Sequence, residues 1–338
     1  MPHDEHHKES VQQSRIGLLI TNLGTPDAPT KQALRRYLKE FLSDPRVVEM
    51  NRVVWWLILN GIILNTRPAK SAKAYQSVWS DEGSPLMLYT RKQQQGLQEL
   101  FGSDVHVEMA MRYGNPSIET GLENLRKQGC GKILLLPLYP QYAAATTGST
   151  FDAVADVLKT WRWVPEFRMI NSYHDDESYI AALASSIRRH WQHHGKPDRL
   201  LFSFHGIPQR YFDQGDPYPC LCRKTARLVA EHLTLEPHQW HLSFQSRFGK
   251  EEWIKPYTDV TLKSWGEEGV NRVDVICPGF ASDCLETLEE IAVENRDYFV
   301  EAGGKELHYI PALNADPDHI RALHQLACNH MGNWLHAR

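Results

Sequence analysis

Short apolar runs alternate with stretches of helical periodicity along almost the whole chain, a pattern typical of parallel β-sheets covered by helices. Eight of these runs are apolar enough to be buried parallel strands. They span residues 17–24, 105–114, 132–140 and 167–173, and then residues 200–206, 241–249, 272–280 and 305–313. The pattern therefore predicts an α/β protein with eight parallel strands.

The second four runs repeat local features of the first four in the same order. The first run of each set leads into a Gly-x-Pro turn, at residues 24–26 and 206–208. The second run of each set ends in an Arg-aromatic-Gly triplet, at residues 112–114 and 247–249. We therefore expect a duplication: two Rossmann-like halves, each with a parallel four-stranded sheet, that face each other across a cleft. Neither first strand is followed by a Gly-x-Gly-x-x-Gly fingerprint and the chain has no P-loop, which argues against a nucleotide enzyme.

The two halves differ in length mainly between their first and second strands. The starts of these strands are 88 residues apart in the first half and 41 in the second, so the first half carries roughly 47 extra residues. We expect a disordered polar tail at residues 1–14, the first half at 15–175 and the second half at 176–338. An apolar segment at about residues 45–85, the lip insertion, lies within the first half.

The lip insertion contains an unusual apolar stretch, residues 53–64. A membrane-spanning helix needs about 20 apolar residues, and polar residues or glycine at positions 51, 52, 60 and 61 interrupt the pattern, so we expect that it does not span a bilayer. Two interpretations remain, a helical hairpin in the core or an exposed lip that receives an apolar ligand and contacts a membrane surface. The lip is favoured because the matching half builds its core without this segment. In that case Trp55, Trp56 and Leu57 contribute little to the core.

Composition narrows the class of protein further. The 338 residues are 42% hydrophobic and 23% charged, as in globular proteins, and the net charge of −4 does not support a nucleic-acid partner. For His3, His6 and His7 in the tail we favour solvated side chains over a metal site.

The cysteines point to a reducing compartment. Six are scattered along the chain, and only Cys220 and Cys222 are close in sequence, without a second pair at zinc-site spacing. Free thiols explain this usage, so we expect a cytoplasmic protein.

Candidate chemistry gathers in the second half. His205 follows an apolar run, and the carboxyl ends of strands face the ligand crevice of an open α/β sheet. Glu286, Glu290 and Glu294 are spaced four apart and share one face of a predicted helix after the third run. For His205 the alternative is a structural histidine held by hydrogen bonds. For the three glutamates the alternative is a solvated helix face. If His205 and Glu286 converge, they are suited to holding a divalent cation or to transferring a proton.

Several longer motifs together resemble the ferrochelatases, enzymes that insert ferrous iron into a porphyrin in the last step of haem synthesis. The resemblance covers residues 16–313. Its motifs are residues 22–26, 111–114, 139–142, 203–208, 244–247 and 280–288.

The resemblance implies a role for each matching residue. His205 and Glu286 match the catalytic pair assigned to iron, with the histidine either a metal ligand or the acceptor of a pyrrole proton. The residues implied to bind the porphyrin are Leu23, Arg67, Ser84, Arg112, Tyr113 and Tyr139. Arg67 and Ser84 match positions near the propionates. If Glu286 lies beside His205, the helical spacing of Glu290 and Glu294, about 6 Å per step, predicts a graded path for protons or metal beyond the pair.

We expect ferrous iron and porphyrin as substrates, without a permanently bound cofactor. Some family members hold a [2Fe–2S] cluster on four cysteines, but here the stretch at 139–142 continues with alanines and the C-terminal region has only Cys328. We expect a monomer without a nucleic-acid partner that contacts the inner face of the cell membrane through residues 47–64.

The apolar lip insertion favours protoporphyrin IX as the substrate and protohaem as the product. The alternatives are a coproporphyrin ferrochelatase, a cobalt or nickel chelatase acting on a sirohydrochlorin-type ring, and a haem-binding protein without catalytic activity.

Overall fold

The structure, a computed structural model, describes residues 15–335. The tail predicted for residues 1–14, with its three histidines, lies outside the described residues.

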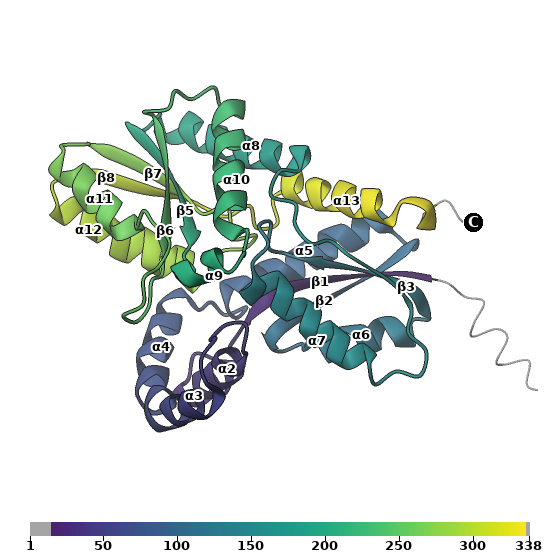
Figure 1. Ribbon diagram of the computed structural model, residues 1–338. Helices are drawn as coiled ribbons and strands as arrows, with labels where there is room; N and C mark the ends of the chain where they lie inside the picture. The colour runs from purple at the N-terminus through teal and green to yellow at the C-terminus, as the bar shows by residue number, and fades with distance from the viewer. Residues whose placement is uncertain (1–14, 336–338) are drawn as a thin grey trace, which may run out of the picture.

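Two parallel four-stranded sheets form the framework (Figure 1). The strands of the first sheet are β1 (Arg15–Thr25), β2 (Val105–Gly114), β3 (Cys130–Pro137) and β4 (Glu166–Met169), in the order β2-β1-β3-β4. Those of the second are β5 (Arg199–His205), β6 (Trp240–Gln245), β7 (Arg272–Ile276) and β8 (Glu306–Ile310), in the order β6-β5-β7-β8. The eight predicted strands are confirmed, and the identical strand order agrees with a duplication. Several strands end earlier than predicted, because residues such as Pro278 lack the N–H that a ladder needs.

Helices cover both faces of each sheet, as alternating side chains on the strands require. In the first half, α5 (Pro85–Phe101) lies on one face, and α6 (Ile118–Lys127) and α7 (Ser149–Leu158) lie on the other. In the second half, α8 (Glu177–His194) and α10 (Tyr218–His232) cover one face. The opposite face packs against α11 (Thr258–Glu267), the π-helix η3 (Glu286–Asn295) and α12 (Arg296–Glu301).

One hydrophobic core runs through both halves. It contains Leu18 and Ile20 of β1 together with Leu200 and Phe202 of β5, whereas Leu19 points to the opposite face of its sheet. The C-terminal helix α13 (Pro317–Met331) returns to the first half, where it packs on α5 and β3 (Figure 1). The division at residue 176 assigned this helix to the second half, but it packs against both halves.

The lip insertion and the helix that precedes it, α2 (Lys31–Ser43), form a lobe beneath the two sheets (Figure 1). Helix α2 packs on α4 (Leu64–Val78), and α3 (Arg52–Ile58) with the π-helix η1 (Leu59–Ile63) connects them. The shorter connection in the second half contains only α9 (Gln209–Asp213) before α10. Two short helices complete the description, the π-helix η2 (Ala144–Gly148) and the 3-10 helix η4 (Gly332–Trp334).

The lip insertion has one buried face and one exposed face. Trp55 is buried with Leu59 and Ile63, and its Nε1 donates to the carbonyl oxygen of Leu42 at 2.6 Å. The exposed fractions of Trp56 and Leu57 are 62% and 59%. The expectation that Trp55 contributes little to the core was therefore wrong, because consecutive residues of a helix point in different directions. Within residues 15–335, no helix is long and apolar enough to cross a membrane.

Candidate active site

A cavity of about 840 Å³ lies at the carboxyl ends of the strands, between the two halves and the lip insertion. Its volume is in the upper part of the range for small-molecule sites. The end of β1, the end of β5, the turn after β7 and helix α4 all contribute to its wall. Among the predicted site residues, those on the wall are Leu23, Arg67, Ser84, Tyr139, His205, Glu286 and Glu294.

Leu23 and His205 occupy equivalent positions, each one residue before the glycine of a Gly-x-Pro turn. Gly24 has a φ of +114°, and a Cβ there would lie 1.8 Å from the carbonyl oxygen of Tyr113. A Cβ on Gly206 would lie 3.0 Å from the carbonyl oxygen of Gln245. Both strands therefore run close to their neighbour as they end, and the side chain before each glycine is on the cavity wall.

The surroundings of His205 select one tautomer of the neutral ring. Its Nδ1 lies 2.7 Å from the carbonyl oxygen of Gly206, and a carbonyl can only accept a hydrogen bond. Nδ1 therefore carries the hydrogen, and Nε2 is left with a lone pair. The ring of Trp253 lies beside the imidazole, with 6.4 Å between their centroids.

Glu286 begins the π-helix η3, which follows the turn after β7, the neighbour of β5 in the sheet. The prediction of an α-helix with a straight carboxylate row was wrong. In a π-helix the backbone hydrogen bonds run from i to i+5, so residues four apart fall short of a full turn. Glu286 and Glu294 lie on the cavity wall, whereas Glu290 is hydrogen-bonded to Gln245 and Ser246 and does not.

Glu290 is held beneath the wall by the loop after β6. Its carboxylate accepts hydrogen bonds from the backbone N–H of Ser246 at 2.7 Å and from Nε2 of Gln245 at 3.3 Å. Ser246 has a φ of +66°, a conformation that non-glycine residues rarely adopt and that is found at functional sites. Burial raises the pKa of Glu290, and the hydrogen bond from Ser246 and the charge of His205 oppose this shift. The charge of Glu286 also raises the pKa of Glu290, so His205, Glu286 and Glu290 interact electrostatically.

Basic and hydroxyl groups from the lip insertion and from α5 lie on another part of the wall. The guanidinium of Arg67 stacks on the ring of Phe248 at 3.9 Å, and burial lowers its pKa. Ser84 is the buried N-cap of α5, where its hydroxyl accepts from the N–H of Met87, so the positive end of this helix meets the cavity. The buried hydroxyl of Tyr139 has no hydrogen-bond partner among residues 15–335.

Arg112 and Tyr113 do not lie on the cavity wall, contrary to the contact implied for them. Arg112 pairs with the buried carboxylate of Asp44, and its Nε donates to Oγ of Ser149 at 2.6 Å. The hydroxyl of Tyr113 donates to the same carboxylate at 2.9 Å. Tyr113 also packs edge-on against Phe41, which does line the cavity, so this cluster supports the wall from behind.

The sequence analysis missed several wall residues. The ring of Trp253 lies beside His205, and the ring of Phe248 stacks with the guanidinium of Arg67. Both aromatic residues belong to irregular loops, where periodicity gives no signal. Lys70 of the lip insertion also lies on the wall, and it opposes the rise in the pKa of Glu289 that burial and Glu294 cause. The Arg-aromatic-Gly motif was the available signal for Phe248, but it did not indicate which ligand or residue the ring would contact.

Two solved structures resemble this chain in fold over nearly its whole length. SirB from Bacillus subtilis, solved with Fe³⁺, has a TM-score of 0.59 and 14% identity, covering 96% of this chain and 98% of that chain. The sirohydrochlorin chelatase SirB from Bacillus subtilis subspecies spizizenii, in complex with cobalt, has a TM-score of 0.54 and 13% identity, covering 94% and 95%. The fold is therefore the chelatase fold.

Sequence comparison identifies the family. The family model described as Ferrochelatase matches residues 15–331. A ferrochelatase of Thioalkalivibrio sulfidiphilus is 59% identical over 326 residues, which cover 95% of this chain and 88% of that protein. A ferrochelatase of Nitrosococcus oceani is 57% identical over 327 residues, covering 96% and 89%. The chain belongs to the ferrochelatase family, as the motifs indicated.

Proposed function

We propose that this protein inserts ferrous iron into protoporphyrin IX, yielding protohaem and two protons. Membership of the ferrochelatase family supports this reaction. The observation that carries the proposal for the site is that His205, with a lone pair on Nε2, and the carboxylate residue Glu286 both line the cavity.

Metallation replaces two pyrrole N–H bonds by bonds to iron, so the site must accept two protons and deliver a cation. Neutral His205 has one unprotonated nitrogen and can accept a proton or bind the incoming metal. Glu286 supplies a carboxylate at the same wall. A metal held by only these two side chains remains easy to release, unlike one in a closed four-ligand site.

Glu290 and Glu294 continue the series of carboxylates along η3 beyond Glu286. The raised pKa of Glu290, caused by burial, makes it a better proton acceptor than an exposed carboxylate. Glu294 is exposed and lies on the wall, where it connects the site to solvent. We assign to these residues the transfer of protons outward or of metal inward.

A porphyrin is a flat apolar disc with acidic edges, and the cavity offers groups for both parts. Leu23 provides apolar wall, and Tyr139 provides an aromatic ring with a free hydroxyl. Arg67 makes no ion pair among the described residues, so its charge is available to a propionate. The α5 N-terminus at Ser84 favours a second carboxylate.

The exposed face of the lip insertion supports peripheral contact with a membrane. Its apolar side chains at least 45% exposed are Met50, Val53, Val54, Trp56, Leu57 and Ile62. A patch of this kind next to the cavity mouth suits an enzyme whose substrate and product partition into lipid. We place the protein in the cytoplasm, at the inner face of the cell membrane, as a monomer without an iron–sulfur cluster.

Anaerobic incubation with ferrous iron and separate porphyrins tests the reaction. Protoporphyrin IX should be metallated fastest, seen as loss of its fluorescence and appearance of the haem absorption spectrum. Coproporphyrin and sirohydrochlorin form the comparison arms, and cobalt or nickel replaces iron in parallel samples. Faster turnover of either comparison ring would overturn the substrate assignment. Haem binding without any turnover would overturn the enzymatic role.

A further inference from the structure

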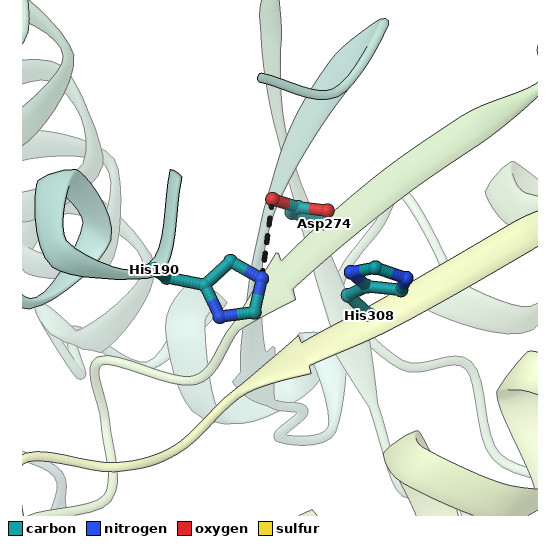
Figure 2. Close-up of side chains that lie close together, drawn as sticks. All are labelled: His190, Asp274 and His308. Carbon is teal, nitrogen blue, oxygen red and sulfur yellow. Dashed lines mark ion pairs between the residues drawn. The ribbon is translucent and has the colours of Figure 1, made fainter. Parts of the chain in front are cut away.

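A second group of side chains that can ligate a metal lies on the face of the second sheet that α8 and α10 cover, away from the cavity wall. It consists of His190 of α8, Asp274 of β7 and His308 of β8 (Figure 2). One ligand atom from each residue lies within 4.8 Å of the others. Asp274 and His308 are register partners on adjacent strands, so the sheet itself sets their spacing.

Each of the two imidazoles has one ring nitrogen that is not satisfied by a hydrogen bond within the described residues. His190 Nε2 and His308 Nδ1 are both buried, and neither has a hydrogen-bond partner among the residues that the structure describes. His190 Nε2 lies 3.5 Å from Asp274 Oδ2, too far for a hydrogen bond. Two ligands bound to one tetrahedral metal at about 2.0–2.2 Å lie about 3.3–3.6 Å apart. The separation therefore matches two ligands of one metal ion.

The residues around the group orient its members as neighbours of metal ligands do. Asp274 is fully buried, and its carboxylate accepts hydrogen bonds from Nε1 of Trp191 at 3.0 Å and from Nε of Arg272 at 3.1 Å. His308 Nε2 lies 3.5 Å from the Glu306 carboxylate, which leaves Nδ1 pointing toward the group.

Charge also allows a cation here. Asp274 and Glu306 are acidic and Arg272 is basic, while the imidazoles ligate a metal in their neutral form. The exposed ring of His194 stacks on His190 with 4.5 Å between their centroids, which restricts the plane of that ring.

We propose that His190, Asp274 and His308 bind a divalent transition metal of the zinc class, at a site separate from the one that handles substrate iron. Two imidazoles and one carboxylate are a donor set that zinc and its neighbours in the first transition row prefer over magnesium or calcium. Because the ligands come from α8, β7 and β8, the bound metal fastens the helix to the edge of the sheet. None of the three residues lies on the cavity wall.

The test measures zinc binding by the full-length chain after removal of metal with a chelator. Wild-type protein and the double variant His190→Gln/His308→Gln are dialysed against zinc, and bound metal is counted by mass spectrometry. We expect the double variant to bind one zinc fewer per chain. Zinc should raise the melting temperature of the wild type more than that of the variant. His193→Gln, an exposed histidine on the same helix, is the matched control and should behave like the wild type. Equal zinc content and equal shifts in the wild type and the double variant would overturn the proposal.

A milder variant covers the case in which the double variant does not fold. Glu306 is exposed, so Glu306→Gln should fold normally, and it removes the carboxylate that faces His308. Its zinc affinity at this site should fall by about 10-fold to 100-fold. An unchanged affinity would contradict the site. Metallation of protoporphyrin, assayed in the same variants, should stay normal, because the substituted residues do not lie on the cavity wall. A failure of the proposed reaction in the wild type would therefore be distinguishable from a failure of the zinc site.

Discussion

His205 and Leu23 lie at matching positions of a duplicated framework, but only one of them can accept a proton. The close approach at Gly24 and Gly206 brings each side chain to the cavity wall. On the proposed function, the chemistry belongs to the second half, and the first half contributes apolar wall together with Arg67 and Ser84, the proposed partners of the porphyrin carboxylates. This asymmetry, rather than the shared fold, assigns the roles.

The carboxylates of η3 should show graded effects on turnover. Glu286→Gln should lower kcat by about 10²-fold to 10⁴-fold, the range for loss of a general acid or base, with porphyrin binding retained. Glu290→Gln should cost less and Glu294→Gln least, because each lies further along η3 from Glu286. Steady-state metallation with fluorescence-based porphyrin binding measures both quantities.

Glu289→Gln is the matched control for this series, since Glu289 is on the same helix but not on the cavity wall. Normal turnover of Glu286→Gln together with a defective Glu294→Gln would show that the row is a solvated helix face.

Arg67 should act on substrate binding more than on chemistry. Arg67→Met removes a cation that the fold holds on Phe248 without an acidic partner among residues 15–335. Since a hydrogen bond to a charged group contributes about 1.5–3 kcal/mol, KM for the porphyrin should rise by about 10-fold to 100-fold with kcat little changed. Lys73→Met, an exposed change on the same helix, should leave both constants unaltered. An equal fall in kcat and kcat/KM would place Arg67 in the chemical step instead.

At the scale of elements, the lip insertion has an inner and an outer face with different expected behaviour. Trp55→Ser should destabilise the fold by about 3–5 kcal/mol, as for other buried aromatic truncations. The pair Trp56→Ser and Leu57→Ser should leave the melting temperature unchanged and weaken binding to liposomes. Thermal melting and vesicle co-sedimentation of the same variants distinguish the two faces. Unimpaired liposome binding by the outer-face variant would remove the membrane proposal.

Asp44, at the C-cap of α2, connects the lip insertion to the first sheet through Arg112 and Ser149. Burial opposes ionisation, but hydrogen bonds from Ser149, Arg46 and Tyr113 and the charge of Arg112 hold the pKa of Asp44 below 3.8. A depressed pKa means that its stabilisation is complete above the unfolded-state value and is lost as the pH falls through the folded-state value.

Asp44→Asn should therefore be less stable than the wild type by about 3 kcal/mol at pH 7, because it leaves Arg112 without its buried partner. The difference should remain constant down to about pH 5 and narrow below about pH 4. Denaturant unfolding at several pH values measures it. A difference that narrows between pH 7 and pH 5 would contradict the depressed pKa.

At the scale of the whole molecule, the two halves are joined by a shared core and by buried hydrogen bonds. Gln93 of α5 is fully buried and donates from Nε2 to the carbonyl oxygens of Ala281 and Asn314, both at 2.9 Å. Its Oε1 accepts from Ser282 at 3.2 Å, in the turn that leads to Glu286. A residue of the first half therefore holds the turn that positions the second half's carboxylate.

Gln93→Leu should lower stability by about 1–3 kcal/mol for each buried polar group left unpaired. It should also lower turnover by displacing Glu286. Unfolding should remain one cooperative transition, because the core is continuous between the halves. The control is Gln94→Leu, a change at the neighbouring position of the same helix. Gln94 donates to the carbonyl oxygen of Val107, within the first half, so this variant should retain turnover. Two separate transitions in the wild type would show that the halves fold independently.

Local pattern and motif spacing determined a large part of this description. The eight apolar runs specified eight strands because a parallel strand buried on both faces must be apolar throughout. The repeated turn at Gly24 and Gly206 indicated the duplication, and the motifs around His205 and Glu286 indicated the family. These features depend on residues close together in the chain, where backbone sterics and periodicity dominate.

Tertiary structure decided which face each side chain presents and which distant residues meet. Adjacent tryptophans in the lip insertion have opposite environments, and Arg112 turns to Asp44 rather than to the cavity, because partners far away in the chain supply the burial and the charge. Glu290 of the π-helix η3 accepts a hydrogen bond from Ser246 in the loop after β6, a contact that periodicity does not register. The group of His190, Asp274 and His308 exists only because a helix crosses two strands from other parts of the chain. Contacts between residues so far apart in sequence arise from the packing of the whole fold, and local pattern carries no record of them.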